Sequence, residues 1–399
     1  MTVRRKIVVF GAGRIGRSFI GQLFSLGGYE VVFADILKTV TDELNRKGWY
    51  NIIIKEEEES VIRVEHVRGV WAGDTEAVIR ELGSTDLAAV SVGQNGLPGI
   101  MPLIAGGLWE RYRSDPGKPL DIIIAENLRN AAHYFEEELI RLLPPDYPFQ
   151  QLVGLVETSI GKMVPIMPQK DLREDPLRVY AEAYNTLILD KRGFKNPVPA
   201  IIGLTPKENM KAWVDRKLFI HNLGHAAAAY LGYVYDPAFQ YIYEVLDVPG
   251  LYEKVRRVML QSAGALLRKY PYEFTEDSLT SHIDDLLKRF RNRALGDTLF
   301  RVGCDLPRKL GPDDRLAGVI RLAREMEVPN DLIVETLVCA CRFRAVDENG
   351  KMFPADEVFS EIYRKGIRQV LTGICHFDPI ADRKLIALAE DLDTQSLFI

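Results

Sequence analysis

The nine residues KLFIHNLGH, at positions 217–225, place a lysine, an asparagine and two histidines among apolar residues and one glycine. The apolar residues around them are typical of a helix, on which each residue turns by about 100°. On such a helix, Lys217, His221 and His225 lie within about 80° of one another, and Asn222 lies about 60° beyond His225. One helix face could therefore present four groups able to accept, donate or hold a proton.

This segment has three interpretations. In the first, Lys217 extends to solvent and the histidines are hydrogen-bonded in a core. In the second, His221 and His225 bind a metal ion at i and i+4, although the sequence lacks the HExxH glutamate and an obvious third ligand. In the third, Lys217 is a general base whose pKa is lowered by apolar neighbours and by nearby cations. Such a base suits alcohol oxidation by NAD, because the hydroxyl proton leaves as the hydride does.

A glycine-rich turn near the amino terminus predicts a dinucleotide site. KIVVF at 6–10 is typical of a strand, GAGRIG follows directly, and the next residues show helical spacing. Gly11, Gly13 and Gly16 fit G-x-G-x-x-G, in which the glycines allow the turn, the approach of a pyrophosphate and close helix packing. Arg14 and Ile15 lie in this loop, where free N–H groups and the helix dipole attract phosphates. These five residues are therefore predicted to bind the cofactor.

The second predicted strand, YEVVFAD, ends in Asp35, nineteen positions after Gly16. A carboxylate at this position accepts hydrogen bonds from the ribose hydroxyls of the adenosine, and it repels a 2'-phosphate. NAD is therefore favoured over NADP, unless a basic residue such as Lys38 compensates.

Further apolar runs at 87–93, 121–127 and 151–157 are separated by stretches long enough for crossover helices, and they predict a doubly wound parallel sheet of the Rossmann type. Such sheets bind ligands at the carboxyl ends of their strands, so Gly93, Glu126 and Asn127 are expected near the nicotinamide half of the cofactor. From the sequence alone, a turn residue that caps the next helix is the simpler interpretation of Asn127.

The pattern changes after residue 200. TPKE at 205–208 reads as a capping box, with Thr205 as the cap and Pro206 in the first turn, and amphipathic stretches then dominate. The sequence therefore predicts a Rossmann-type domain at 1–198 and a mainly helical substrate-binding domain at 199–399. Between the early strands, YNIII and VIRVEHV flank KEEEES and predict a hairpin with a solvated, charged turn.

Composition restricts the class of partner. A net charge of -5 and a pI near 5.8 give no strong field for nucleic acid, and no apolar run is long enough to span a membrane. The amino terminus enters a strand without a signal-peptide core, so a cytoplasmic location is expected. The four cysteines form no CxxC pair, which predicts reduced thiols rather than disulfides or a structural zinc site.

The motif K-x4-N-x2-H, filled by Lys217, Asn222 and His225, resembles the signature of the polyol-specific long-chain dehydrogenases. The similarity runs almost from end to end. It includes the early glycine loop, AENLRN at 125–130, VDRKLFIHNLGHAAAAYLG at 214–232 and RVGCDLPRKLGPDDRL at 301–316. Four such blocks in this order are far more specific than the glycine motif alone.

The resemblance implies a role for each matching residue. Lys217 would be the general base, Asn127 and Asn222 would hydrogen-bond the reacting oxygen, and His225 would orient the substrate. In the block at 301–316, the basic residues expected to contact the polyol are Arg301, Arg308 and Lys309. The same region contains Arg291, Arg293 and Arg315, which either help to hold a phosphate monoester or form a solvated helix end.

The expected function is therefore the NAD-dependent interconversion of mannitol 1-phosphate and fructose 6-phosphate. The reaction is expected to need no metal ion. The protein is expected to be a monomer or a weak homo-oligomer. Two positions depart from the pattern of phosphate-specific members: Cys304 stands where an arginine is usual, and Ile160–Lys162 replaces V-D-R. An unphosphorylated hexitol, as in mannitol 2-dehydrogenases, or a hexuronate is the alternative substrate. A regulator that binds NAD without catalysis is the alternative from another class.

Overall fold

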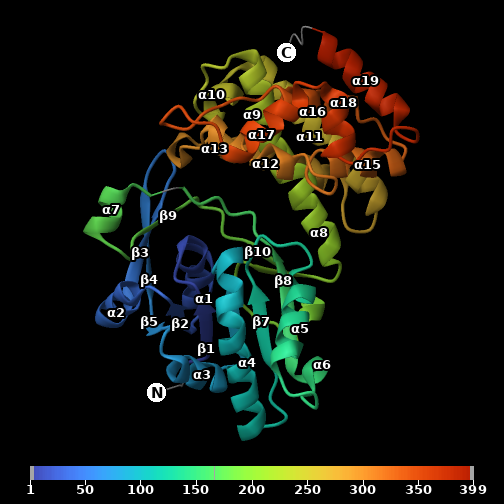
Figure 1. The fold of residues 1–399 in the computed structure, drawn as a ribbon. Coiled ribbons are helices and arrows are strands. Elements are labelled where there is room, and N and C mark those ends of the chain that lie inside the picture. The colour runs from blue at the N-terminus through green and yellow to red at the C-terminus, as the bar shows by residue number, and fades with distance from the viewer. Residues whose placement is uncertain (1–3, 166, 396–399) are drawn as a thin grey trace. The chain divides into compact units, whose positions relative to one another are not determined.

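The computed structural model describes residues 4–165 and 167–395, and the chain divides into two compact units, Met1–Trp213 and Val214–Ile399 (Figure 1). The predicted helix start at TPKE was wrong, because these residues form β11 (Leu204–Lys207), which pairs in parallel with β10 (Leu187–Asp190). Pro206 is tolerated there because β11 is the edge strand of its sheet. The division between the two compact units lies between Trp213 and Val214, beyond the end of this strand.

The main sheet of unit 1 has the strand order β11-β10-β8-β7-β6-β1-β2-β5. Its parallel strands are β5 (Val67–Trp71), β2 (Glu30–Asp35), β1 (Lys6–Phe10), β6 (Leu87–Val90), β7 (Leu120–Ile124) and β8 (Val153–Ser159). Numbered along the chain, their order is 3-2-1-4-5-6, which is the doubly wound order of dinucleotide-binding folds. The predicted Rossmann-type sheet is confirmed.

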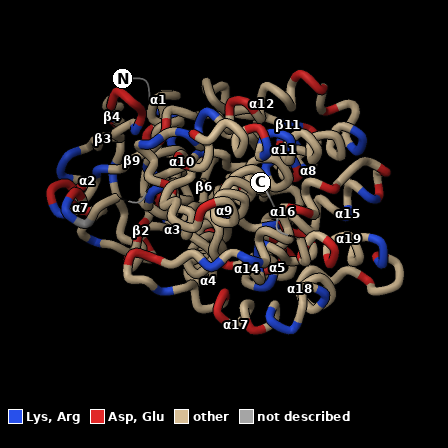
Figure 2. The backbone as a smooth tube through the Cα atoms, turned by 90° about the horizontal axis from the view of Figure 1, so that it is seen from above, with Lys and Arg blue, Asp and Glu red and all other residues tan. Residues whose placement is uncertain are grey.

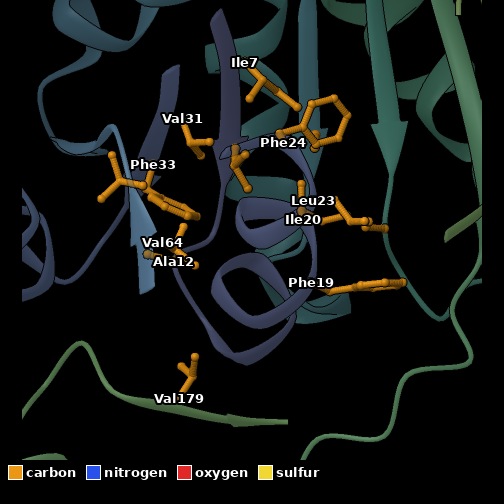
Figure 3. Packing of buried hydrophobic residues seen from close by; sticks show 14 of the residues in the cluster. Ile7, Ala12, Phe19, Ile20, Leu23, Phe24, Val31, Phe33, Val64 and Val179 are labelled. Atoms are coloured by element: carbon orange, nitrogen blue, oxygen red, sulfur yellow. The ribbon is translucent and has the colours of Figure 1, made fainter. Parts of the chain in front are cut away.

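Alternation along β1 builds a separate core on each face of this sheet. Ile7 and Val9 belong to one buried cluster, whereas Val8 and Phe10 belong to the other. The helices of unit 1 are η1 (Gly16–Gly21), α1 (Gln22–Leu26), α2 (Lys38–Lys47), α3 (Thr75–Gly83), η2 (Gln94–Gly96), α4 (Leu97–Ser114), α5 (Ala131–Leu142), α6 (Phe149–Leu152), α7 (Gln169–Glu174) and η3 (Lys191–Gly193), and α8 (Met210–Arg216) begins in unit 1 and ends in unit 2. Of these, α3, α4 and α5 cover the Val8 face, while η1 and α1 cover the Ile7 face (Figure 3).

A small second sheet, ordered β4-β3-β9, packs against η1 and α1. β3 (Trp49–Ile54) and β4 (Ser60–Glu65) form the predicted antiparallel hairpin, β9 (Val179–Ala181) joins β3 in parallel, and the acidic turn at 56–59 is exposed. Basic and acidic residues are interspersed along the neighbouring α2 and α7 (Figure 2), where Lys47 lies 3.1 Å from Glu43 and 3.0 Å from Asp175. The hairpin thus packs through apolar contacts on the Rossmann-type core, and the Lys47 ion pairs join α2 to the segment after α7.

Unit 2 is built from helices, as the amphipathic pattern predicted. They are η4 (Lys217–Asn222), α9 (Leu223–Tyr235), α10 (Ile242–Asp247), α11 (Pro249–Lys269), α12 (Glu276–Phe290), η5 (Arg293–Leu295), α13 (Leu299–Gly303), α14 (Leu306–Lys309), α15 (Ala317–Glu325), α16 (Asp331–Cys341), α17 (Pro354–Tyr363), α18 (Ile367–Gly373) and α19 (Arg383–Thr394). All four cysteines carry free thiols, as expected. Among the described residues, no helix combines the length and the apolar character needed to cross a bilayer.

Candidate active site

The turn after β1 has the shape of a dinucleotide loop. Gly11 adopts φ +92°, and a Cβ on it would lie 2.5 Å from the carbonyl oxygen of Ser91, whereas a Cβ on Gly16 would overlap the carbonyl oxygen of Gly11. Gly13 differs, because a Cβ on it would meet no atom within 4 Å. Packing therefore requires glycine at positions 11 and 16, while the open space at Gly13 fits the approach of a diphosphate.

The helix after this loop begins with exposed residues. Arg14 opens the helical turn, Ile15 is partly buried, and the amide of Arg17 donates to the carbonyl of Gly13 at 3.0 Å. The helix then continues in a π register from Gly16 to Gly21. Its amino-terminal N–H groups and the exposed guanidinium of Arg14 form a surface suited to phosphate oxygens.

Asp35 ends β2 beside this loop. Its Oδ2 accepts from the amide of Ala12 at 2.6 Å, and its Oδ1 accepts from the amide of Leu37 at 2.8 Å. Lys38 pairs with Asp42 at 2.8 Å, so its charge is directed to its own helix. The carboxylate therefore adds a negative charge at the carboxyl end of β2 beside the glycine loop, which would disfavour a 2'-phosphate at this position.

Exposed apolar side chains beside Asp35 were missed by the sequence reasoning. Ile36 is 79% exposed, Leu37 57% and Trp71 43%, and the indole N–H of Trp71 donates to the carbonyl of Ile36 at 3.2 Å. These residues present exposed apolar side chains against which a planar base could pack. Two apolar residues directly after the aspartate that ends the strand were the available signal.

The loops after β6 and β7 are tied together. The amide of Gly93, at φ +78°, donates to Oε1 of Glu126 at 2.8 Å, and Gln94 Nε2 donates to the carbonyl of Asn127 at 3.1 Å. Burial raises the pKa of Glu126, and its bonds from backbone amides act in the opposite direction. The next helix, α5, is preceded by Asn130 as its N-cap residue, so Asn127 does not cap it. The structure thus gives Glu126 a role in fixing the loop that carries Gly93.

Lys217 and Asn222 lie at the two ends of η4, which is a π-helical segment rather than the regular α-helix assumed from the sequence. Hydrogen bonds in this register span five residues, so they bring residue 222 about one turn above residue 217 instead of rotating it away by about 140°. The π register thus places residue 222 nearer the helix face of Lys217 than an α-helix would. Burial, together with the positive charge of Arg315, lowers the pKa of Lys217 to about 8.

The two histidines have different surroundings in unit 2. His221 is buried, and this burial lowers its pKa well below the usual value, so it is neutral. His225 stacks on Phe290 with ring centroids 4.5 Å apart, and its Nε2 lies 3.2 Å from Oδ2 of Asp297. Residues 4–165 and 167–395 contain no group of three or more metal-ligating side chains. Asp297, which forms an ion pair with Arg301 as well, was not identified from the sequence.

Most cations of the basic segment are paired with carboxylates. Arg291 and Arg293 are exposed and share Asp247 at 2.9 and 2.7 Å, which fits the solvated helix end. Arg315 departs from that interpretation because it is buried, with its Nε 2.8 Å from Asp314. In the same segment, Arg308 pairs with Asp305.

Lys309 is held differently. Its buried Nζ donates to the carbonyl of Val302 at 2.6 Å, and burial lowers its pKa to about 8. An ammonium group has three donors, so this contact uses one of them. Lys309 is therefore suited to bind an acceptor oxygen of a ligand.

A Rossmann-type unit with a glycine loop, followed by a helical unit with a partly buried lysine of lowered pKa, is typical of two-domain dinucleotide-dependent dehydrogenases. The family model described as Mannitol dehydrogenase Rossmann domain matches residues 5–203, and that described as Mannitol dehydrogenase C-terminal domain matches residues 209–385. The chain belongs to the mannitol dehydrogenase family, which confirms the relationship to polyol dehydrogenases expected from the sequence. With the acidic end of β2, this Rossmann domain identifies NAD as the cofactor.

Solved structures share the fold over nearly the whole chain. Pseudomonas fluorescens mannitol 2-dehydrogenase, in a ternary complex with NAD and D-mannitol, is 16% identical with a TM-score of 0.76, and the match covers 98% of this chain and 92% of that one. A substrate-free D-sorbitol dehydrogenase is also 16% identical, with a TM-score of 0.82 and coverage of 98% and 93%. At this identity the similarity establishes the architecture alone.

Proposed function

We propose that this protein is an NAD-dependent polyol dehydrogenase with mannitol-1-phosphate 5-dehydrogenase activity, which interconverts mannitol 1-phosphate and fructose 6-phosphate. The observation that carries this proposal is Lys217, a partly buried amine with a pKa of about 8 that shares a π-turn with Asn222. A general base works best when its pKa lies near the working pH. Family membership supplies the reaction class, and the lysine supplies the proton acceptor that the reaction needs.

Each proposed catalytic residue has a distinct task. Bound NAD supplies the hydride acceptor, and its reduced form supplies the donor. During oxidation, Nζ of Lys217 takes the hydroxyl proton, and during reduction it returns that proton to the new hydroxyl. The amides of Asn222 and Asn127 donate hydrogen bonds to the oxygen as negative charge develops on it. His225 orients the substrate.

The proposed cofactor contacts follow the first unit. The diphosphate approaches Gly13 and the amides around Arg14 and Ile15, and the ribose hydroxyls bind Asp35. The exposed Ile36 takes the adenine. Gly93, held by Glu126, borders the nicotinamide half.

Phosphate recognition is assigned to the basic segment of unit 2. Lys309 contributes a buried ammonium group with unused donors, while Arg301 and Arg308 contribute guanidinium groups suited to phosphate oxygens. This assignment requires the two arginines to serve a phosphate in addition to their carboxylate partners.

The pairing of these arginines with carboxylates favours a second candidate substrate, which is an unphosphorylated hexitol or a hexuronate. Arg301, Arg308 and Arg315 each lie against a carboxylate, which reduces the positive charge available to a phosphate. The deciding experiment is NADH formation with mannitol 1-phosphate, mannitol, sorbitol 6-phosphate and an aldonate, with NADP as the control cofactor. Selective turnover of mannitol 1-phosphate supports the first candidate, and preference for an uncharged polyol or a sugar acid supports the second.

Replacement of Lys217 separates an enzyme from a regulator that only binds NAD. Lys217→Ala removes the proton acceptor, so turnover should fall by about 10²- to 10⁴-fold while NADH binding stays nearly intact. The exposed Lys211 of α8 provides a matched control, since Lys211→Ala should leave both quantities unchanged. Wild-type turnover by Lys217→Ala would refute the base assignment.

Two further expectations belong to this proposal. A monomer suffices for activity, as the resemblance to the polyol dehydrogenases suggests, and the elution mass on a sizing column tests this. A cytoplasmic location agrees with four unpaired thiols, and cell fractionation tests it.

A further inference from the structure

We infer that Asp297 is a positioning residue, which holds the imidazole of His225 and the guanidinium of Arg301 in one fixed arrangement. This inference rests on the proposed function, in which both partners serve the substrate. Asp297 itself is 4% exposed and acts through its two neighbours. The assignment follows from its contacts, its backbone anchoring and the two oxygens of its carboxylate.

The carboxylate is shared between two helices of unit 2. Oδ2 lies 3.2 Å from Nε2 of His225 on α9, and Oδ1 forms an ion pair with Arg301, one helical turn further along in α13. Each oxygen therefore faces a different nitrogen group, the imidazole of His225 or the guanidinium of Arg301. Burial of a carboxylate costs free energy unless such partners compensate it, and here the guanidinium supplies the opposite charge.

The backbone around Asp297 is anchored on both sides. Its carbonyl accepts from the amide of Ile242 at 2.9 Å, and the next residue, Thr298, bridges to Tyr241. The hydroxyl of Thr298 also accepts from the amide of Arg301 at 3.1 Å, which caps α13. These backbone contacts thus fix the position of Asp297, so that its carboxylate can orient the side chains of His225 and Arg301.

The contact with Asp297 selects one form of the histidine. A carboxylate oxygen repels an unprotonated ring nitrogen, so with Nε2 3.2 Å from Oδ2 neutral His225 carries its proton on Nε2, and Nδ1 is then the unprotonated nitrogen. Stacking on Phe290, with an interplanar angle of 7°, fixes the plane of the ring. Carboxylate–histidine pairs set tautomer and orientation in the same way at other sites.

Asp297→Asn tests this arrangement with little change in shape. An amide has one acceptor oxygen, so its NH₂ group must face either His225 Nε2–H or Arg301, and one of the two contacts becomes donor against donor. We expect the kcat/KM for the preferred polyol to fall by about 10- to 100-fold while NADH binding is retained. In ¹⁵N NMR spectra, the signals of His225, assigned with a His225→Gln variant, should report a loss of the single Nε2–H tautomer.

A matched control is available in the same unit. Asp247 also bridges two arginines, Arg291 and Arg293, through a carboxylate. Asp247→Asn should therefore leave both kcat/KM and the His225 signals as in the wild type. Asp297→Glu retains two acceptor oxygens, so it should keep the tautomer and an activity closer to wild type than Asp297→Asn.

The outcomes separate this inference from the proposed function. Inactivity of the wild type towards every polyol would refute the function, but the tautomer test would still stand, because NMR needs no turnover. The positioning role is overturned if Asp297→Asn has the kcat/KM of Asp247→Asn and an unchanged His225 tautomer. If Asp297→Asn fails to fold, a mixed His225 tautomer in a folded Asp297→Glu variant would overturn it as well.

Discussion

At the scale of single residues, the environment of Lys217 turns an ordinary surface residue type into a candidate base. Desolvation disfavours the charged form, and Arg315 adds repulsion, so the pKa of Lys217 falls to about 8. Oxidation needs the free amine, so its rate should rise with pH and level off above about 8. Reduction needs the ammonium form and should decline over the same range.

Arg315→Gln tests the electrostatic part of this argument. Loss of a buried cation raises the pKa of Lys217, so the rising limb of kcat/KM for oxidation should move to higher pH. A shift of half to one unit corresponds to about 3- to 10-fold slower oxidation at pH 7. Arg291→Gln is the control, since Arg291 is paired with Asp247 and should leave the profile in place. If the rising limb of the kcat/KM profile stays at the same pH in Arg315→Gln, burial alone lowers the pKa of Lys217.

At the scale of elements, the glycine loop separates packing from binding. Gly16→Ala forces a Cβ into the carbonyl of Gly11, so it should destabilise the protein by about 1–3 kcal/mol. Gly13→Ala meets open space, so its free energy of unfolding should stay within about 0.5 kcal/mol of wild type. Its methyl group would instead stand against the diphosphate, and the Kd for NADH should rise about tenfold or more.

Denaturant unfolding and NADH fluorescence titration of the two variants provide the check. The expected pattern is reciprocal: Gly16→Ala loses stability, and Gly13→Ala loses affinity. Wild-type affinity in a folded Gly13→Ala variant would place the diphosphate away from this loop.

At the scale of the whole molecule, cofactor binding should stabilise the folded chain. A ligand present at about 100 times its Kd adds about 2.7 kcal/mol, which raises the melting temperature by several degrees for units of this size. NADH should produce this shift and NADPH a much smaller one, because Asp35 repels a 2'-phosphate. Lys38→Ala should keep the same preference, since Lys38 pairs with Asp42. Equal shifts with both cofactors would remove Asp35 as the selecting residue.

The sequence by itself determined the features that depend on local pattern. Period-two and helical spacing predicted the parallel sheet and the helical unit, and the glycine spacing with Asp35 predicted the cofactor. These signals are local because strand alternation, the sharp turn and the strand-ending carboxylate involve neighbouring residues. The lysine, asparagine and histidine of the second unit were proposed as site residues because their short motif resembles that of the polyol dehydrogenases.

Only the tertiary structure decided the features that depend on distant partners. TPKE looked like a helix cap, yet pairing with β10 made it a strand, because tertiary hydrogen bonds outweigh a weak local preference. The π-turn at Lys217, the burial of Arg315 and the sharing of Asp297 between His225 and Arg301 likewise needed the packed fold. Spacing along a chain shows which groups are present, whereas burial and opposing charge, which arise only on packing, set their pKa values and their orientation.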